Sequence, residues 1–519
     1  MTERPTERPA HDSRKAYRLW FTAVSALAFV VFVLTIRFGA FVAGGADSSG
    51  YLTQARLWER GTLITNESLI EKVDWPFADW TFSPLGFRPG IKRGTIVPLY
   101  SAGYPIVMGL IRRVFGAGNE MYIVPITAAG LVVCTAIFGT WVGGFLIGAA
   151  SSLLIATSPP FVLQSLQPMS DVPTAFWWSL AAILGSGRRL IYSLTSAASV
   201  AMAILTRPNL VPLAIPLVIF VLAARRREES SYNWMGAIIV AGGVVVAAAL
   251  VAYLNTIFYG TPGSSGYGAP RDLYELGFGP INFVRYTRWL LQTETVLVVA
   301  AVAGLFALVA LARHSFAGRW AMFATVVFAI ILLSYLFYRP FDNWTYLRFF
   351  LPAYPLLFVA LLSIANFDVF ANRRGLRTVV IVMTTVIVVG AHIKFMLDNH
   401  VFQTKALEQK YLTVTDYIRR SLPANAVFIS HQYTGSIRYY TDRRILRYDW
   451  LEPDRLDSAV QTLESLGYKP YFLLEDWEEP VFQGRFVGDS ALAKLDWYPS
   501  VEFPTNHARI YDPAKRPAK

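Results

Sequence analysis

The feature that most constrains the fold is a series of apolar runs, most of them about as long as a bilayer is thick. A helix needs roughly 20 apolar residues to cross the hydrocarbon core, and about eleven runs approach that length. The chain of 519 residues is 54% hydrophobic and 16% charged, with a mean hydropathy of +0.40, which is too apolar for a soluble multidomain protein. We therefore predict a polytopic α-helical membrane protein with about 11 transmembrane helices. The predicted spans are residues 19–40, 120–141, 145–162, 172–187, 190–206, 209–224, 234–258, 295–312, 320–338, 348–366 and 377–396.

Basic residues predict the orientation of these spans. Short clusters of Lys and Arg fall on one side of the membrane when the spans are drawn in order, and the positive-inside rule makes that side the cytoplasm. The N-terminus is then inside and the C-terminus outside. The formal net charge of +12 is explained by these clusters, so we do not expect nucleic-acid binding. The clusters are Arg14, Lys15 and Arg18; Arg188 and Arg189; Arg225, Arg226 and Arg227; Arg313 and Arg319; and Arg373, Arg374 and Arg377.

The order of the spans divides the chain into three parts. Residues 1–18 form a polar, basic cytoplasmic tail, and the run after it lacks a cleavage site, so we expect a retained first helix. Residues 19–396 form the transmembrane domain, which includes a long first outer loop at 41–119. Residues 397–519 form a soluble α/β domain on the outer face. Cys134, which lies in an apolar run, is the single cysteine, so an intramolecular disulfide is excluded.

The first outer loop and the outer domain each have a predicted local structure. Between Tyr100 and Gly116 the apolar residues follow a helical period, which predicts an amphipathic helix on the membrane surface. After residue 405, helical and strand patterns alternate, which favours a small layer with a mostly parallel sheet. The apolar face of the surface helix comprises Ile106, Val107, Leu110, Ile111 and Val114. The predicted strands are residues 426–431, 443–449, 470–476 and 508–512, and the predicted helices are residues 407–421, 436–440 and 454–466.

Charged residues recur where predicted spans meet the outer surface. Asp47 follows the first span, Asp171 directly precedes the fourth, and Arg207 and Arg348 lie beside later spans. Each also has a purely structural interpretation. Asp47 and Asp171 are suited to cap helices, and the two arginines are suited to anchor helices at lipid headgroups. Lys92 and Arg93 lie in the first outer loop, either as surface charges or as anion ligands.

One aspartate with several cations suits the displacement of a lipid phosphate from the anomeric carbon of a sugar. The attacking hydroxyl needs a base, and a carboxylate can take its proton. The leaving phosphate is a weak base that needs cations rather than a proton donor, and Arg or Lys supplies them. The paired carboxylates of glycoside hydrolases are not required.

Five motifs in order resemble the GT-C superfamily of polyprenol-phosphate-dependent glycosyltransferases. They resemble in particular the bacterial branch of protein O-mannosyltransferase-like proteins and lipid A aminoarabinose transferases. The resemblance spans about residues 20 to 360, and the YYTDRR stretch, Tyr439 to Arg444, resembles the outer domain of many bacterial members. The motifs are D-x-x-x-Y (Asp47, Tyr51), Y-x-x-G-Y-P (Tyr100 to Pro105), S-D-x-P (Ser170 to Pro173), T-R-P-N (Thr206 to Asn209) and R-F-x-L-P-A-x-P (Arg348 to Pro355).

The resemblance implies that Asp47 matches the catalytic aspartate of the first loop and that Asp171 matches a second acidic position. Two departures bear on the acceptor and on the phosphate contacts. Ser48 follows Asp47 where protein mannosyltransferases often carry an acidic pair, and Lys92 and Arg93 precede Gly94 where aminoarabinose transferases place a lysine before prolines.

The sequence therefore predicts an inverting glycosyltransferase at the outer face of a bacterial inner membrane. Asp47 and Asp171 would be catalytic, and Lys92, Arg93, Arg207 and Arg348 would bind the phosphate of a polyprenyl-phosphate sugar. Tyr51 and Tyr104 either line the sugar pocket or pack as interface aromatics. The acceptor is a lipid, a glycan or a protein. The alternatives are a lipid-linked sugar transporter and a non-catalytic envelope assembly protein.

No cofactor follows from this chemistry, and a divalent cation stays open. The acidic run Glu67, Glu71, Asp74 and Asp79 has oxygen ligands of the right kind but fits no known metal loop, and a solvated face is the simpler interpretation. His392 and His400 flank the end of the last span, where isolated histidines are usually not metal ligands.

Overall fold

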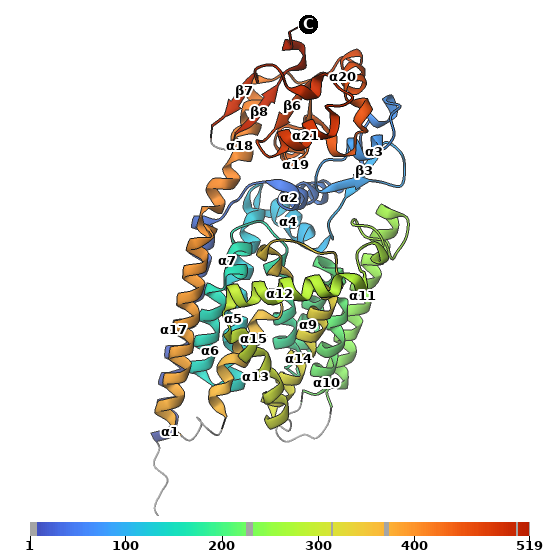
Figure 1. Ribbon diagram of the computed structural model, residues 1–519. Helices are drawn as coiled ribbons and strands as arrows, with labels where there is room; N and C mark the ends of the chain where they lie inside the picture. The colour runs from blue at the N-terminus through green and yellow to red at the C-terminus, as the bar shows by residue number, and fades with distance from the viewer. Residues whose placement is uncertain (1–7, 225–231, 313–314, 368–372, 505–506, 518–519) are drawn as a thin grey trace, which may run out of the picture. The chain divides into compact units, whose positions relative to one another are not determined.

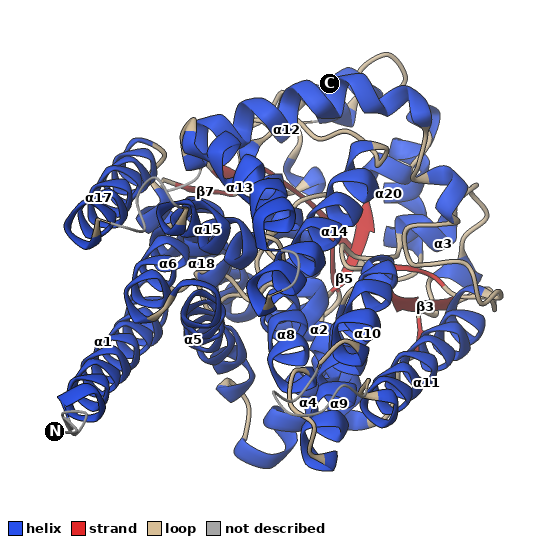
Figure 2. Cartoon of the chain, turned by 90° about the horizontal axis from the view of Figure 1, so that it is seen from below, coloured by secondary structure: helices blue, strands red, loops and turns tan. Residues whose placement is uncertain are grey.

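The computed structural model describes residues 8–224, 232–312, 315–367, 373–504 and 507–517 (Figure 1). Of the predicted basic clusters, residues 225–227 and Arg313 lie outside these ranges. The described chain is mostly helical, and its sheets contain three and five strands (Figure 2). It divides into two compact units. The helical unit comprises residues 1–39, 121–251 and 270–404, and the sheet unit comprises residues 40–120, 252–269 and 405–519.

The helical unit contains a helix at every predicted span. Among the described residues, five helices are long and apolar enough to cross a membrane, and the number rises to 8 if each bent pair of helices is one span. This is a multi-pass membrane protein, while the predicted number of spans and the predicted orientation stay predictions. The helices are α1 (Arg8–Phe38), α5 (Ile123–Gly143), α6 (Phe145–Thr157), α7 (Pro159–Ser165), α8 (Asp171–Gly185), α9 (Leu190–Thr206), α10 (Ala214–Leu222), α11 (Trp234–Tyr259), α12 (Gly279–Glu294), α13 (Leu297–Ala312), α14 (Phe316–Leu336), α15 (Tyr354–Ser363) and α17 (Arg374–Asp398).

Two predicted spans are not continuous helices. The run 145–162 breaks between α6 and α7 with a bend of 62°, and Pro159 and Pro160 begin the second piece. Proline removes a helical hydrogen bond and clashes with the preceding turn, so the helix ends before the pair. The run 348–366 begins inside a 3₁₀ helix, Trp344–Phe350, and continues as α15 after a bend of 83°. Here Pro352 and Pro355 fall at the break.

Helix α12 was not predicted from the sequence. It meets α13 at 103° and crosses the directions of α13 and α14 (Figures 1 and 2). Tyr286 and Trp289 on one side are buried, while Phe283 and Val284 are exposed. Helix α12 is therefore amphipathic, as expected of a helix that lies along a membrane surface.

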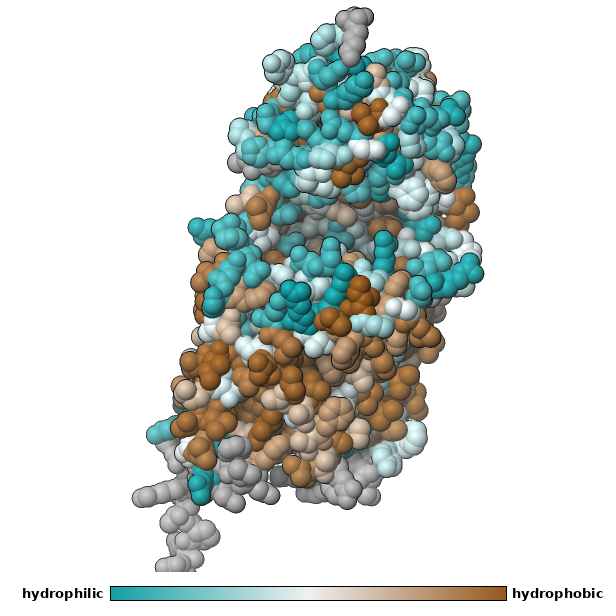
Figure 3. All heavy atoms as spheres, in the orientation of Figure 1, coloured by the Kyte–Doolittle hydropathy of each residue, from teal (hydrophilic) through white to brown (hydrophobic). Residues whose placement is uncertain are grey.

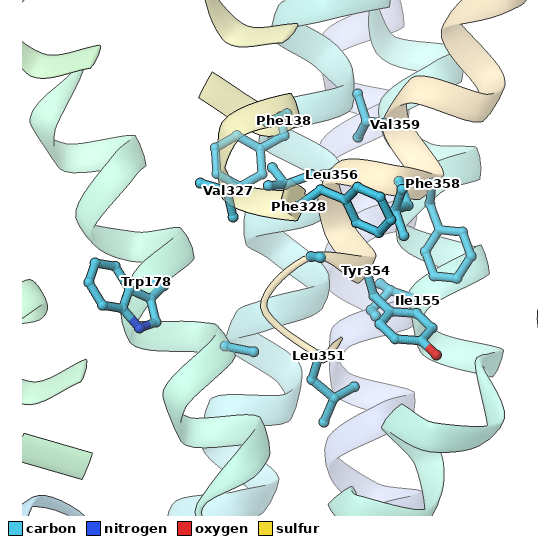
Figure 4. Close-up of a cluster of buried hydrophobic side chains, with 14 of the residues drawn as sticks. Phe138, Ile155, Trp178, Val327, Phe328, Leu351, Tyr354, Leu356, Phe358 and Val359 are labelled. Carbon is cyan, nitrogen blue, oxygen red and sulfur yellow. The ribbon is translucent and has the colours of Figure 1, made fainter. Parts of the chain in front are cut away.

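The helical unit has a large apolar core and an apolar exterior. Side chains such as Phe138, Ile155 and Phe358 fill the core (Figure 4). Large apolar residues are also exposed along α11, α13 and α17, and brown residues cover the face of this unit seen in Figure 3. Such a large exposed apolar surface is typical of a contact with lipid.

The sheet unit begins with the predicted first outer loop. This segment folds around an antiparallel sheet of order β1-β3-β2. The surface helix predicted near residues 100–116 is α4, and on its predicted apolar face Leu110 and Val114 are exposed. The elements are α2 (Gly45–Arg60), β1 (Thr65–Asn66), α3 (Ala78–Thr81), β2 (Phe87–Pro89), β3 (Thr95–Pro98) and α4 (Gly103–Phe115).

The C-terminal part of the sheet unit is an α/β layer with a mixed sheet of order β5-β4-β6-β8-β7. Strand β4 pairs parallel with β5 and β6, but β8 pairs antiparallel with β6 and β7. The prediction of a mostly parallel sheet is therefore wrong for this second half, because β7 and β8 are too close in sequence for a parallel crossover. The elements are α18 (Thr404–Ser421), β4 (Ala426–Ser430), α19 (Thr434–Thr441), β5 (Arg444–Arg447), α20 (Leu456–Ser465), β6 (Lys469–Leu474), α21 (Glu478–Phe486), β7 (Val501–Phe503) and β8 (Ala508–Tyr511).

The first-loop segment and the α/β layer share one apolar core. Ile70, Trp75 and Phe82 pack in the same cluster as Val427 and Phe472 of the sheet. The two segments are more than 300 residues apart in the chain, so neither apolar pattern alone could reveal that they fold together.

Candidate functional site

Asp47 is the third residue of α2, in its first turn. Gly44 is the N-cap, so the interpretation of Asp47 as the capping residue is wrong. The partial positive charge at a helix N-terminus favours a carboxylate in the first turn. This position therefore suits an ionised side chain, although it does not by itself assign a catalytic role.

Tyr100 fixes the Asp47 side chain. Its hydroxyl donates a hydrogen bond of 2.7 Å to Asp47 Oδ1. Tyr100 is buried, and this burial together with the charge of Asp47 raises its pKa well above the ordinary value. The phenol therefore stays protonated at neutral pH and holds the carboxylate in one orientation. Tyr100 begins the Y-x-x-G-Y-P motif, so the sequence contained a signal for it. Only Tyr104 of that motif was predicted as a site residue.

Gly50 makes room for Tyr100 against α2. A Cβ atom on Gly50 would lie 2.7 Å from Cδ2 of the Tyr100 ring and 2.8 Å from Cα of Gly86. Carbon atoms without a bond between them normally stay about 3.5 Å or more apart. A glycine one helical turn after Asp47 is therefore what allows the Tyr100 hydroxyl to reach the carboxylate.

Two further tyrosine rings pack near Tyr100. Tyr51 contacts Tyr100, and Tyr104 contacts Tyr51. The Tyr51 ring lies 4.6 Å from that of Tyr100 and 5.1 Å from that of Tyr104. Tyr51 is 7% exposed and Tyr104 is 2% exposed. Both rings are buried, as the packing interpretation predicts, and a part in the sugar pocket stays a prediction. Tyr267 is a fourth ring, 6.1 Å from Tyr100, and is mostly exposed.

The segment that leads into α2 is held by α19. The Ala43 amide donates to the Tyr440 hydroxyl at 2.8 Å, and its carbonyl accepts from Ser436 at 2.6 Å. On α2 itself, Arg56 donates to the Tyr439 carbonyl at 2.9 Å and lies over the Tyr439 ring. The YYTDRR stretch therefore includes contacts that position the start of the helix that carries Asp47.

Lys92 and Arg93 lie in the exposed turn between β2 and β3. Arg88, which was not predicted from the sequence, makes more contacts than these two exposed residues. Its guanidinium donates to the carbonyls of Ser265 and Gly266 at 3.1 and 3.0 Å. It also lies over the rings of Trp80 and Tyr259.

In the helical unit, Asp171 and Arg207 form a buried ion pair. Asp171 is 1% exposed, and its Oδ1 accepts a hydrogen bond of 2.5 Å from Arg207. Its Oδ2 is buried and has no hydrogen-bond partner within the described ranges. Arg207 is thus more than a helix anchor that reaches for lipid headgroups, because a buried carboxylate orients it.

Arg207 and Arg348 lie beside the same aromatic ring. Each guanidinium carbon is 5.4 Å from the centroid of Phe349. Phe349 stacks on Tyr335 at 4.5 Å, and Asn209 of the T-R-P-N motif donates to the Tyr335 hydroxyl at 2.8 Å. The motifs around Arg207 and Arg348 therefore meet in one cluster. Two fixed guanidinium groups are a suitable anion site.

A second buried polar group in the helical unit was not predicted. His392 Nε2 lies 2.7 Å from Glu294 Oε2, and Ser158 donates to Glu294 Oε1 at 2.9 Å. Thr157 lies 3.1 Å from His392 Nδ1. The group joins α17 to the bends at Ser158 and after α12. His392 thus has a partner that its isolated place in the sequence did not reveal.

The acidic run of the first loop is not one solvated face. Glu67 is buried and forms ion pairs with Arg444 and, at 3.5 Å, with Arg438. Asp79 accepts from the Gly94 amide at 3.3 Å, while Glu71 and Asp74 are exposed. In the part of the chain that is described, no three His, Cys, Asp or Glu side chains gather as a metal site would require.

The chain matches no protein-family model and no curated protein sequence. Solved structures share its fold over nearly its whole length. Apo ArnT from Cupriavidus metallidurans has a TM-score of 0.59 at 12% identity, covering 97% of this chain and 100% of that chain. ArnT bound to undecaprenyl phosphate gives 0.58 at 12% identity, covering 96% and 99%. The apo oligosaccharyltransferase of Archaeoglobus fulgidus gives 0.55 at 12% identity, covering 96% of this chain and 75% of that one.

Proposed function

We propose that this chain, which has the fold of the GT-C polyprenyl-phosphate glycosyltransferases, transfers a sugar from a polyprenyl-phosphate donor to a hydroxyl acceptor. The observation that carries the proposal is the hydrogen bond of 2.7 Å that fixes the Asp47 carboxylate to Tyr100 within this fold. A carboxylate held in one orientation by a protonated phenol is suited to act as a base.

In the proposed reaction, the acceptor oxygen attacks the anomeric carbon of the sugar. Its proton passes to the Asp47 carboxylate as the new bond forms. The bond between the anomeric carbon and the phosphate oxygen breaks on the opposite face, and its electron pair stays with the polyprenyl phosphate. One displacement inverts the anomeric configuration, so the product has the opposite anomer to the donor.

Arg207 and Arg348 are the proposed ligands of the donor phosphate. Support comes from their shared position beside Phe349 and from the strength of guanidinium–phosphate pairs. Two solved structures with this fold contain lipid phosphates: ArnT with undecaprenyl phosphate, and the Archaeoglobus fulgidus oligosaccharyltransferase AglB with a dolichol-phosphate. Lys92 and Arg93 stay proposed as further phosphate contacts from the first loop.

Asp171 has a different proposed role from Asp47. Its Oδ1 holds Arg207, while its buried Oδ2 is suited to accept a hydrogen bond from a hydroxyl of the substrate. We propose that Asp171 orients the donor and that Asp47 alone removes the proton. The proposed location is the inner membrane of a bacterium, with the sheet unit on the periplasmic side.

The experiment is sugar transfer by the purified protein in proteoliposomes. Synthetic polyprenyl-phosphate sugars and an envelope extract are supplied, and released polyprenyl phosphate and glycosylated product are measured by mass spectrometry. The proposal expects both products in equal amounts, with the anomer inverted. Comparing envelope glycans of cells with and without the gene identifies the sugar and the acceptor.

A lipid-linked sugar transporter is the second candidate, favoured by the buried Glu294–His392 pair. Ionisable residues inside membrane-spanning units often mark transport pathways. The same proteoliposomes separate the candidates, because a transporter moves a fluorescent lipid-linked sugar across the bilayer without releasing polyprenyl phosphate. That outcome would replace the glycosyltransferase proposal.

A further inference from the structure

Three aromatic rings of the sheet unit form a partly exposed surface, here called the aromatic shelf: Phe77, Trp80 and Trp450. The two indole rings stack with centroids 4.5 Å apart and planes 19° apart. The Phe77 ring lies 6.3 Å from that of Trp450 and is 57% exposed. Phe77 and Trp80 flank the start of α3, whereas Trp450 follows β5. The fold therefore brings together rings from segments that are far apart in the chain.

The backbone of Phe77 adopts a conformation that phenylalanine disfavours. Its φ of 58° and ψ of 24° are left-handed, a region that bulky side chains seldom adopt. Glycine would adopt these angles without strain, and burial does not explain the phenylalanine because its side chain is mostly exposed. Strained backbone that presents an exposed side chain is typical of binding sites. We therefore infer that the exposed phenyl ring is the reason for a phenylalanine at this position.

Two charged side chains with fixed partners lie close to the shelf in space or in sequence: Arg88 and Asp449. Arg88 lies over Trp80, with 5.4 Å between the guanidinium carbon and the ring centroid. Asp449 precedes Trp450 in the chain and accepts from Arg447 at 3.1 and 2.5 Å, while His431 Nδ1 lies 3.2 Å from its Oδ1. Burial alone would raise the pKa of Asp449, but its His431 and Arg447 partners outweigh burial and lower it to about 2. The Asp449 carboxylate is thus ionised at neutral pH and partly exposed.

A series of contacts leads from the shelf to the Asp47 site within the same unit. Arg88 holds the carbonyls of Ser265 and Gly266. The next residue, Tyr267, packs edge-on against Tyr100, which donates to Asp47. A molecule held on the shelf would therefore contact side chains that these interactions connect to the proposed base.

We propose that the aromatic shelf binds the glycan of the acceptor. The apolar C–H face of a pyranose packs against flat aromatic rings, and its hydroxyl groups exchange hydrogen bonds with fixed carboxylate and guanidinium groups. The shelf supplies rings and charges together, as a site for an amphipathic ligand requires. Carbohydrate binding to the shelf can be tested without any turnover. Only the identification of the bound glycan as the acceptor rests on the proposed function.

The test uses the full-length protein in lipid nanodiscs. The probes are linear pentasaccharides of mannose, glucose, galactose and arabinose, titrated by calorimetry and by saturation-transfer NMR. We expect at least one of them to bind, and we expect Trp450→Ala to weaken that binding about tenfold or more, as truncation of a central aromatic anchor does. Tyr498→Ala is the matched control, because Tyr498 is an aromatic residue of the same unit that is 94% exposed. Binding by this variant should equal that of the wild type.

Phe77→Gly separates binding from folding. Glycine suits a φ of 58°, so this variant should unfold at the wild-type temperature or above it while binding the glycan more weakly. The inference is overturned if none of the pentasaccharides binds, or if both Phe77→Gly and Trp450→Ala bind as tightly as the wild type. Asp47→Asn should keep the binding and lose the transfer. A wild-type protein that binds glycans but transfers no sugar would refute the proposed function and leave the shelf assignment standing.

Discussion

Replacing Gly50 by alanine should disrupt the hydrogen bond between Tyr100 and Asp47. The added Cβ atom would lie closest to Cε2 of Tyr100 and 2.7 Å from its Cδ2, so the ring must move by about 0.8 Å or more to restore an ordinary carbon contact. The Cβ atom would also lie 2.8 Å from Cα of Gly86, a backbone atom that cannot rotate away as a side chain can. A ring displacement of about 0.8 Å along the hydrogen bond would lengthen it from 2.7 Å to about 3.5 Å, beyond the usual range for a hydroxyl donor.

The net effect on stability combines two opposite terms. Overpacking costs about 1–3 kcal/mol, while alanine in a helix interior is favoured over glycine by about 0.8–1 kcal/mol. We therefore expect a net loss of roughly 0–2 kcal/mol. Because an ångström of misplacement can cost about 100-fold in rate, we expect sugar transfer to fall by one to two orders of magnitude.

Gly484→Ala is the matched control for Gly50→Ala. Gly484 lies inside α21 of the same unit, and a Cβ atom there meets nothing within 4 Å. This control should keep full activity and unfold at an equal or higher temperature. The assays are thermal unfolding in detergent and release of polyprenyl phosphate. If Gly50→Ala behaves like Gly484→Ala in both assays, then Gly50 does not position Tyr100.

Three further predictions concern single contacts. Tyr100→Phe keeps the ring but removes the donor to Asp47, so we expect a stability loss of about 1 kcal/mol and at least a tenfold slower transfer; wild-type rates would contradict this. Burial raises the pKa of Glu408 above its ordinary value of 4.5, so the folded state retains a proton that the unfolded state loses, and stability falls as pH rises through that interval. As the pH rises from about 4 to 7, the unfolding temperature of Glu408→Gln should therefore fall less steeply than that of the wild type. If the two plots of unfolding temperature against pH are parallel, the pKa of Glu408 is not raised in the folded state. Asp171→Ala leaves Arg207 without its buried partner and should cost about 3 kcal/mol. Adding Arg207→Ala should recover part of that loss in a double-mutant cycle, whereas strictly additive losses would deny the coupling.

The local pattern of the sequence predicted the elements better than their connections. Apart from α12, the helices of the helical unit coincide with the predicted apolar runs, and residues 426–431 contain β4, because spans and buried strands carry their signal in a short window. The bends at Pro159 and Pro352 could have been recognised from proline alone. The core shared by Trp75 and Phe472 could not, because it depends on segments that meet only in the fold.

The candidate site was predicted where a motif contained the residue and missed where the contact is long-range. Asp47, Asp171 and Arg207 were singled out from the sequence, and Tyr100 lay within a quoted motif. Arg88 was missed because its partners, the carbonyls of residues 265 and 266, carry no side-chain signal. The Glu294–His392 pair was missed for a similar reason, since the two residues are 98 positions apart.

Asp47 is the proposed base that removes the proton of the acceptor, and turnover by Asp47→Asn tests this role. Asparagine keeps the size of the side chain and can still accept the Tyr100 hydrogen bond, but it cannot take a proton at neutral pH. We predict wild-type unfolding temperature and donor affinity, with the rate of polyprenyl phosphate release lowered about 100-fold or more. An Asp47→Asn variant that transfers sugar at the wild-type rate would contradict the claim.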